Sequence, residues 1–181
     1  MSRTVVLAYS GGLDTSVCVR WLADRGWRVV AFMANVGQGD PAPAAIRRAK
    51  VAGAAQVIVR DLRREFVTDY IWPALKANAV YEGGYLLATA LSRPLIAKHL
   101  VDVAHQLKAR AVAHGCTGKG NDQVRFEVTV RILDPSLAIV APVREWEFRS
   151  REEEIDYARH HRIPVDVTRR SPYSIDANLW G

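Results

Sequence analysis

The chain has 181 residues, of which 49% are hydrophobic, and a formal net charge of +6 at pH 7. This length suits a single domain with a sizeable core, and no segment approaches the uninterrupted apolar length that a membrane span needs. The first apolar run follows no charged leader and no apolar signal core, so we expect a cytoplasmic protein without a membrane partner. The cations are spread in ones and twos, without an aromatic-interleaved stripe, so small anionic substrates explain the charge at least as well as nucleic acid, and we expect no nucleic-acid partner.

Five short apolar runs predict the strands of a sheet. The runs are Thr4–Ala8, Val29–Ala34, Gln56–Val59, Ala111–Ala113 and Leu137–Ala141. They are continuous rather than alternating, as is typical of strands buried on both faces of a parallel sheet. Because helical segments separate them, we predict an α/β fold: a doubly wound, mainly five-stranded parallel sheet with helices on both faces.

Apolar residues at helical intervals predict the helices between the strands. Beyond the helix that follows the first strand, these are Ala44–Ala52, Arg63–Asn78, Ile96–Leu107 and Gln123–Leu133. Pro73 is expected to kink or interrupt the second of these. Ser150 and Glu153 have the spacing of a capping box, so a further helix is predicted over Arg151–His160.

The cysteines and histidines indicate no metal or redox chemistry. Cys18 and Cys116 form no Cys-x-x-Cys pair and no metal-ligand spacing, which argues against zinc, iron–sulfur and thiol-redox sites. Cys18 falls on the apolar side of the first predicted helix, where we expect it in the core. The adjacent His160 and His161 end a helical pattern, and we interpret them as partners of the helix dipole rather than metal ligands.

A glycine turn joins the first predicted strand to the helix that follows it. Gly11 and Gly12 let successive N–H groups point at one anion. The start of the helix adds unpaired N–H donors and the positive end of its dipole, and Ser10, Thr15 and Ser16 add hydroxyls. The alternative is an ordinary strand-to-helix turn with a capping Ser or Asp. We favour a phosphate-binding loop, although neither Gly-x-x-x-x-Gly-Lys-Ser/Thr nor Gly-x-Gly-x-x-Gly is present.

The run Ser-Gly-Gly-x-Asp-Thr-Ser resembles the signature of the PP-loop ATP pyrophosphatases. In that superfamily the loop binds the β- and γ-phosphates, and ATP is cleaved to AMP and pyrophosphate. The resemblance implies an adenine nucleotide α-hydrolase-like fold, with ATP as substrate and Mg²⁺ as cofactor. The residues that it assigns to the ATP loop are Ala8, Tyr9, Ser10, Gly11, Gly12, Leu13, Asp14, Thr15 and Ser16. Asp14 is a plausible partner of Mg²⁺, and its alternative is a carboxylate that the helix dipole favours.

A second polar loop follows the fourth predicted strand. His114–Glu127 contains three glycines that allow close approach to a ligand, together with several hydrogen-bond donors and the Asp122 carboxylate. This loop resembles the signature of argininosuccinate synthase. Other segments agree with the same family, namely Val36–Gly39, Ala79–Tyr85, Ser92–Lys98 and Ser171–Asp176. The resemblance is therefore spread along the whole chain.

The resemblance to argininosuccinate synthase implies a ligase of arginine biosynthesis and the urea cycle. In its reaction the ureido oxygen of citrulline attacks the α-phosphate of ATP, giving a citrullyl-adenylate and pyrophosphate. The amino group of aspartate then displaces AMP. This chemistry needs charge stabilisation on phosphate oxygens rather than a protein nucleophile, and no nucleophile–base arrangement is visible in the sequence.

The family's binding positions are carried over one residue at a time. Ala34 and Gly115 match positions beside the adenosine, with strand-end packing as the alternative. The aspartate positions are Thr117, Asn121 and Asp122, and the citrulline positions are Tyr85, Asn121, Arg125 and Ser174. Arg125 would form a bidentate pair with a carboxylate, whereas Tyr85 could equally be a core aromatic.

Three neighbouring positions are not assigned to a substrate. Thr89 is close enough in sequence to help Tyr85, but Ala90 stands where some relatives carry Ser. Lys119 could face phosphate, aspartate or solvent.

The chain also departs from the family pattern in length. Family members are considerably longer and form homo-oligomers, so we expect residues 1–168 to be the nucleotide-binding domain and 169–181 to begin a linker to a synthetase domain that this chain lacks. It is then either a fragment or a naturally short relative that binds ATP but makes argininosuccinate poorly alone. The alternatives are a standalone nucleotide-binding module, a subunit of a split enzyme, or another PP-loop adenylating enzyme.

Overall fold

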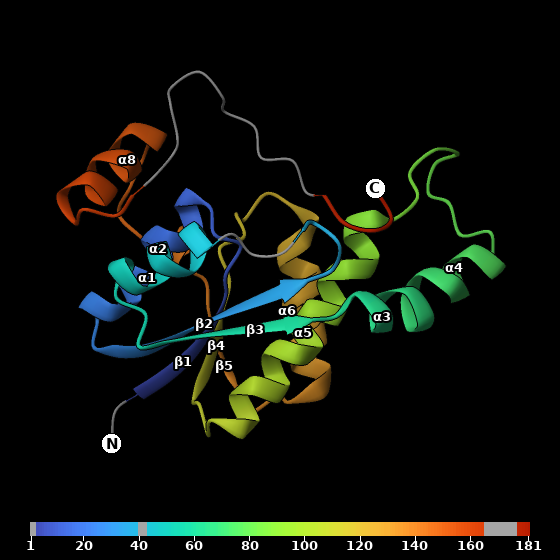
Figure 1. Ribbon diagram of the computed structural model, residues 1–181, viewed down its shortest axis with the longest axis horizontal. Coiled ribbons are helices and arrows are strands. Elements are labelled where there is room, and N and C mark those ends of the chain that lie inside the picture. Colours follow the sequence, from blue (N-terminus) through green and yellow to red (C-terminus); the bar gives the residue numbers. More distant parts are fainter. Residues whose placement is uncertain (1–2, 40–42, 165–176) are drawn as a thin grey trace.

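One five-stranded parallel sheet forms the centre of the structure, with the strand order β3-β2-β1-β4-β5 (Figure 1). The computed structural model describes residues 3–39, 43–164 and 177–181. Its strands are β1 (Arg3–Ala8), β2 (Trp27–Asn35), β3 (Gln56–Asp61), β4 (Ala111–Ala113) and β5 (Ala138–Val140). From β1 the chain winds outward to β3 and then returns to place β4 beside β1 on the other side. The strand order therefore reverses between β1 and β4, as in doubly wound sheets.

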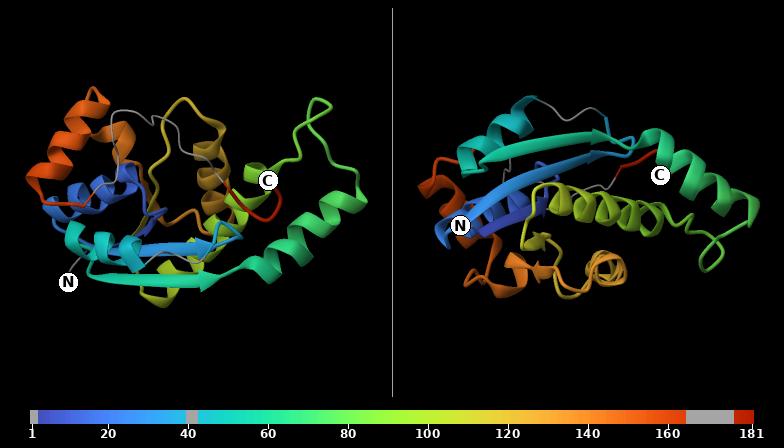
Figure 2. Two further views of the ribbon diagram at one scale, coloured as in Figure 1. Left: turned by 45° about the horizontal axis from the view of Figure 1, so that its top comes forward. Right: turned by 90° about the horizontal axis from the view of Figure 1, so that it is seen from below.

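Helices cover both faces of the sheet, as predicted. They are α1 (Leu13–Asp24), α2 (Pro43–Ala52), α3 (Arg63–Glu65), the π-helical η1 (Phe66–Ile71), α4 (Trp72–Lys76), α5 (Ala88–Gln106), α6 (Asn121–Leu133), α7 (Pro142–Glu145) and α8 (Arg151–His160). Val5 and Leu7 of β1 pack in a core cluster with α1, α2 and α8, whereas Val6 packs in a second cluster with α5 and α6. Figure 2 shows α2 and α5 on opposite sides of the sheet.

The three inner strands are buried, whereas the two edge strands are not. Every residue of β4 is buried, as are most of β2 and half of β1. In β3 and β5 no residue falls in the buried class. The expectation that all five strands are covered on both faces is therefore wrong for the edges, because an edge strand has a neighbouring strand on one side only and less helix above it.

Several predicted boundaries shift by a few residues. The helix expected at Gln123 begins at Asn121, because Gly120 takes an extended conformation directly before it. The helix expected over Ile96–Leu107 begins at Ala88 and has Pro94 inside it. Cys18 has no exposed surface and lies in the core, as predicted. Burial raises the pKa of its thiol well above the usual value.

An arm formed by α3, η1, α4 and the loop after them projects from the sheet (Figures 1 and 2). The predicted helix over Arg63–Asn78 ends at Lys76, and its middle is π-helical rather than α-helical. The irregularity predicted at Pro73 is present, since this proline is the second residue of α4, which follows the π-helical turn. A proline ring crowds the carbonyl group four residues earlier in an α-helix, and the wider π-helical turn relieves this contact.

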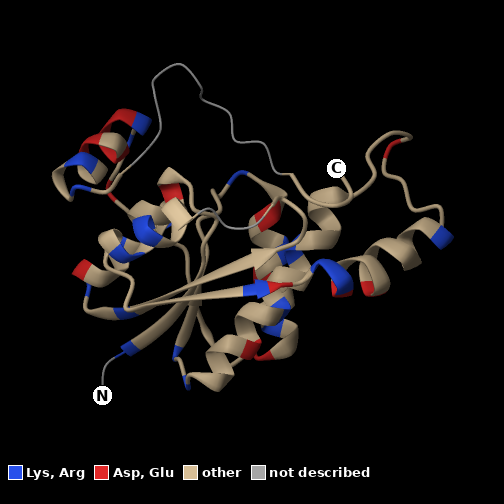
Figure 3. Ribbon diagram, viewed as in Figure 1, with Lys and Arg blue, Asp and Glu red and all other residues tan. Residues whose placement is uncertain are grey.

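Charged residues of both signs are interspersed over the fold (Figure 3). On α8, acidic residues occupy the first turn and basic residues the last, which matches the helix dipole. None of the helices in the described part of the chain combines the length and the apolar character needed to cross a membrane.

Candidate functional site

Three polar loops follow neighbouring parallel strands and lie together at the carboxyl ends of these strands. They are Ser10–Ser16 after β1, Val36–Gly39 after β2 and His114–Asn121 after β4, and β1 lies between the other two strands. A side chain at Gly115 would place its Cβ 3.1 Å from Cγ2 of Thr15, so the third loop packs directly against the first. These loops lie where the strand order reverses, which is where doubly wound sheets bind their ligands.

The backbone of Ser10–Ser16, the loop predicted to bind phosphate and called the phosphate loop below, needs a glycine at position 11. Gly11 has φ +87°, and a Cβ there would lie 2.9 Å from Cβ of Ala45 in α2. Gly12 is the N-cap of α1 and is extended, with no side chain capping the helix. The first N–H groups of α1 therefore lack a capping side chain and remain available to an anion.

Hydroxyl groups hold the phosphate loop in shape. The buried Ser16 hydroxyl donates to the carbonyl of Gly12 (2.7 Å) and lies 3.0 Å from the Tyr9 hydroxyl. Ser10 Oγ accepts from the N–H of Gly12 (3.3 Å) and lies 3.1 Å from Thr15 Oγ1. Burial raises the pKa of Tyr9, so its phenol stays neutral. Ser16 and Tyr9 therefore support the loop from the core side, and Ser10 is exposed.

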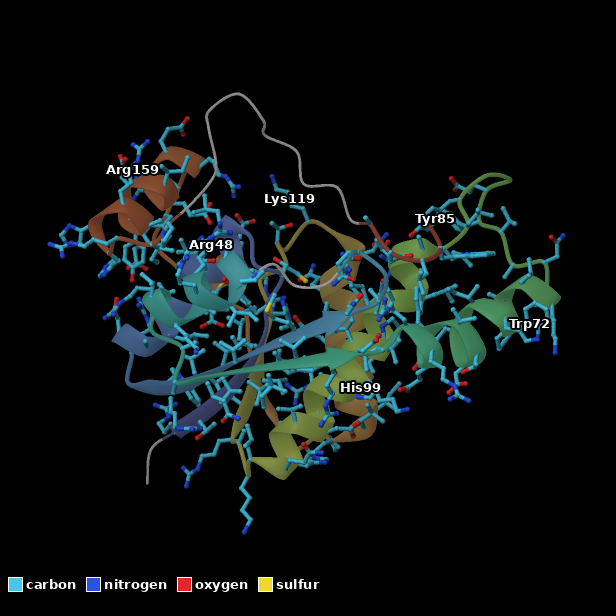
Figure 4. All side chains as sticks on the ribbon, viewed as in Figure 1. Arg48, Trp72, Tyr85, His99, Lys119 and Arg159 are labelled. Atoms are coloured by element: carbon cyan, nitrogen blue, oxygen red, sulfur yellow. The ribbon has the colours of Figure 1, made fainter. Side chains whose placement is uncertain are left out.

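Arginines from two helices reach the phosphate loop, and the sequence analysis singled out neither. Arg48 of α2 donates to the carbonyl of Gly11, and Arg151 of α8 donates to the Asp14 carboxylate. Figure 4 shows Arg48 on the side of the molecule that also carries α8. The capping box predicted where α8 begins, but no local pattern indicates which element it packs against.

A buried carboxyl group lies beside this arginine. Glu154 is 5% exposed, and its Oε2 accepts from Arg151 Nη1 at 3.0 Å. Burial, and then the nearby Asp14 carboxylate, raise the pKa of Glu154 to about 8. Within the described residues Glu154 Oε1 has no hydrogen-bond partner.

A second cluster of predicted residues lies between the starts of α5 and α6. The Tyr85 hydroxyl lies 2.6 Å from Thr89 Oγ1, which also accepts from Arg125 Nη1 at 3.2 Å. Arg125 Nη1 donates to Asp122 Oδ1 at 2.5 Å. Tyr85 is 38% exposed, so it is not a core aromatic. Thr89 thus joins Tyr85 to Arg125, and Arg125 contacts Asp122 directly.

Arg93 is a member of this cluster that the sequence analysis did not single out. Its Nε donates to Asp122 Oδ2 at 2.8 Å, so the Asp122 carboxylate lies between two guanidinium groups. Arg93 lies before the helix predicted over Ile96–Leu107, and no local pattern indicates its partner.

The other predicted substrate residues lie on the same loop or outside the described chain. Thr117 and Asn121 are exposed beside the start of α6. Lys119 is exposed and extends outward from the loop (Figure 4). Ala34, 9% exposed, is the second-to-last residue of the inner strand β2. Ser174 lies outside the described residues.

The buried His114 anchors the base of the third loop. Its Nδ1 accepts from the N–H of Cys116 (3.3 Å), and its Nε2 lies 3.3 Å from Glu127 Oε1. Burial lowers the pKa of His114, although the Glu127 carboxylate opposes this and Arg144 adds to it. His114 is therefore a polar residue of the core that positions the loop.

The sheet topology and the glycine loop at its reversal point define the class, a PP-loop-like α/β domain. Solved structures confirm the fold. A predicted subunit of a tRNA methyltransferase from Methanocaldococcus jannaschii superposes with a TM-score of 0.59 at 17% identity, covering 84% of this chain and 76% of that one. A 4-thiouridine synthetase in complex with RNA and bound ATP gives a TM-score of 0.60 at 15% identity, covering 88% of this chain and 40% of that one.

The chain belongs to the argininosuccinate synthase family. The family model of the arginosuccinate synthase N-terminal HUP domain matches residues 4–164. Argininosuccinate synthase from Pelotomaculum thermopropionicum is 58% identical over 177 residues, which cover 97% of this chain and 44% of that protein. The chloroplastic argininosuccinate synthase of Arabidopsis thaliana is 57% identical over 180 residues, which cover 98% of this chain and 36% of that protein. The chain therefore spans less than half the length of these relatives.

Proposed function

We propose that this chain provides the ATP-binding part of an AMP-forming carbon–nitrogen ligase of the argininosuccinate synthase type. The reaction joins citrulline and aspartate to argininosuccinate through a citrullyl-adenylate and releases AMP and pyrophosphate. The observation that carries the proposal is the packing of Gly115 against Thr15, because it joins the phosphate loop to the loop that bears the substrate residues. Membership of the family supports the same reaction.

On the nucleotide side, the chain's own groups bind and orient phosphate. The backbone N–H groups at the uncapped start of α1 are the proposed donors to the anion, and Ser10 adds an exposed hydroxyl. Ala34 and Gly115 lie at the ends of β2 and β4, where small residues leave room for adenosine. Held in this way, the α-phosphate can be presented in line with the attacking ureido oxygen.

Magnesium fits the donors at this loop. No group of three or more His, Cys, Asp or Glu side chains that could hold a metal occurs within residues 3–39, 43–164 and 177–181. A protein cage is not required, since Mg²⁺ commonly binds through one or two carboxylates together with substrate phosphates. Asp14 is the carboxylate proposed for this role, and the ion would neutralise charge on the phosphate oxygens.

On the acceptor side, the cluster around Arg125 provides groups for amino-acid substrates. Arg125 can donate a planar pair of hydrogen bonds to the carboxylate of citrulline, with Tyr85 beside it. The groups proposed for aspartate are Thr117 and Asn121 for its carboxylate and Asp122 for its ammonium. The Asp122 carboxylate also contacts the guanidinium groups of Arg93 and Arg125, which fix its position beside the proposed ammonium site.

We further propose that residues 1–168 are the nucleotide-binding domain and that 169–181 begin a linker. The family model ends at residue 164, close to the proposed boundary. The chain covers 44% of the relative from Pelotomaculum thermopropionicum, so contacts to both amino acids from the remaining part of such proteins are to be expected.

Calorimetry with ATP, citrulline and both together tests this function. We expect the chain to bind MgATP and citrulline to strengthen that binding. Arg125→Lys should weaken citrulline binding roughly tenfold, because lysine cannot copy the planar fork, while leaving ATP binding nearly unchanged.

A matched control is Arg131→Lys, which changes an arginine further along the same helix, α6. Equal losses of ATP and citrulline binding in Arg125→Lys would indicate a structural role for Arg125. ATP binding without any coupling to citrulline would instead favour a standalone nucleotide-binding module.

A further inference from the structure

Helix α8 brings one arginine to the phosphate loop from 137 positions further along the chain. Arg151 is the first residue of α8, and its Nη1 donates to the carboxylate of Asp14 in the first turn of α1. The first turn of α1 is also where the uncapped N–H groups of the phosphate loop lie. The guanidinium group is therefore held within a side-chain length of the proposed phosphate position.

This guanidinium group has further hydrogen-bond donors that could contact a ligand. All the hydrogen bonds that Arg151 makes to described residues come from Nη1, which donates to Asp14 and Glu154. Its Nε and Nη2 have no partner in the part of the chain that the structure describes, and the side chain is 46% exposed. Arginine presents its donors in a planar fork that matches two oxygens of one phosphate.

Two carboxyl groups hold the arginine in this place. Glu154 lies one turn along α8 and is almost wholly buried, and its Oε2 accepts from Nη1 of the arginine. The Asp14 carboxylate accepts from the same nitrogen. An arginine anchored by two acidic partners loses less side-chain freedom when it binds a third.

The charge of Asp14 also requires a compensating cation near the nucleotide. A carboxylate in the first turn of α1 repels the phosphates that bind at the same helix end. Arg151 offsets this repulsion, and Arg48 of α2, which donates to the Gly11 carbonyl, lies against the loop as well.

We propose that Arg151 binds a phosphate oxygen of the nucleotide, held in position by Asp14 and Glu154. This inference rests on the proposed ATP-binding function and adds to it a residue from outside the phosphate loop. The ligand that it contacts is the polyphosphate of a nucleoside triphosphate.

The test is a calorimetric comparison of Arg151→Gln with the unchanged chain, using ATP and adenosine as probes. We expect Arg151→Gln to weaken ATP binding about tenfold, since hydrogen bonds to charged groups contribute that much. Adenosine binding should not change. The loss should appear both with Mg²⁺ and with EDTA, because the proposed contact is to phosphate and not to the metal. The ATP affinity of Arg151→Lys should lie between those of the unchanged chain and Arg151→Gln.

The matched control is Arg159→Gln on the same helix (Figure 4). Arg159 is 66% exposed and pairs with Asp156 at 3.4 Å, so its loss should leave ATP binding unchanged. Thermal unfolding of each variant checks that α8 still packs.

Three results would overturn the inference. They are unchanged ATP binding in Arg151→Gln, an equal loss for adenosine, and a loss confined to the Mg²⁺ titration. If the unchanged chain binds adenosine and ATP equally, the proposed phosphate loop itself fails. That outcome is visible before any variant is made.

Discussion

At the scale of single residues, Gly37 determines how the loop after β2 meets the end of the described chain. The N–H of Leu179 donates to the carbonyl of Val36 at 3.0 Å, and the indole N–H of Trp180 donates to the carbonyl of Leu86 at 2.5 Å. Residues 177–181 thus connect the loop after β2 with the start of α5. This arrangement needs a residue without a side chain at position 37.

Replacing Gly37 should therefore destabilise the protein more than replacing Gly39. Both glycines have a positive φ, +112° and +94°, which strains any other residue. A Cβ at position 37 would also lie 2.6 Å from the backbone nitrogen of Leu179, whereas nothing lies within 4 Å of one at position 39. We expect Gly37→Ala to lower the free energy of unfolding by about 2 kcal/mol more than Gly39→Ala, because overpacking typically costs roughly 1–3 kcal/mol. Urea denaturation measures both, and equal losses would show that the contact with Leu179 contributes nothing.

At the scale of elements, the start of α8 is defined by its cap. Ser150 Oγ accepts from the N–H of Glu153 at 3.2 Å, as the predicted capping box requires. The carboxylate of Glu153 accepts from the N–H of Arg149 at 2.7 Å, one residue before the N–H expected for that motif. The cap satisfies backbone donors that would otherwise be unpaired. It also fixes the position of Arg151, because this residue is the first of α8.

Removing this cap should cost stability without changing the core. Ser150→Ala is expected to lower the free energy of unfolding by about 1 kcal/mol, and Ser150→Asp should restore most of it, because aspartate caps as well as serine does. Urea denaturation of both variants measures the difference. If Ser150→Asp is as unstable as Ser150→Ala, the hydroxyl of Ser150 has a role other than capping.

At the scale of the whole molecule, the buried His114 links stability to pH. Burial lowers its pKa below the ordinary value of 6.5, so the unfolded chain binds a proton more readily than the folded one. Stability therefore rises with pH wherever the unfolded state binds more protons, and it is lost as the pH falls below about 6.5. Glu127 and Arg144 are the charged groups that face this histidine, from α6 and α7.

The free energy of unfolding should accordingly fall between pH 7.5 and 5.5 more steeply in the unchanged chain than in His114→Asn. The extra slope is limited to about 1.4 kcal/mol per pH unit for one proton. Urea denaturation across this range measures it. Above pH 8 the two slopes should coincide, and identical slopes below pH 7 would show that His114 does not carry the effect.

Sequence patterns alone predicted much of this protein. The apolar runs predicted five parallel strands, and the glycine turn predicted the loop after β1, because both depend on backbone geometry and on the spacing of neighbouring residues. The exposure of the edge strands and the π-helical turn before Pro73 were not predicted. Both depend on what packs around an element rather than on the element's own residues.

Only the tertiary structure decided which distant side chains meet. Arg151 against Asp14, Arg93 against Asp122 and Leu179 against Gly37 each join segments far apart in the chain. No local pattern carries these pairings, because they depend on the strand order and on how the helices pack. The sequence by itself determined a glycine turn at the end of a buried strand, where we propose that phosphate binds. The fold decided which arginines stand beside it, because contacts between distant segments exist only once the sheet has brought them together.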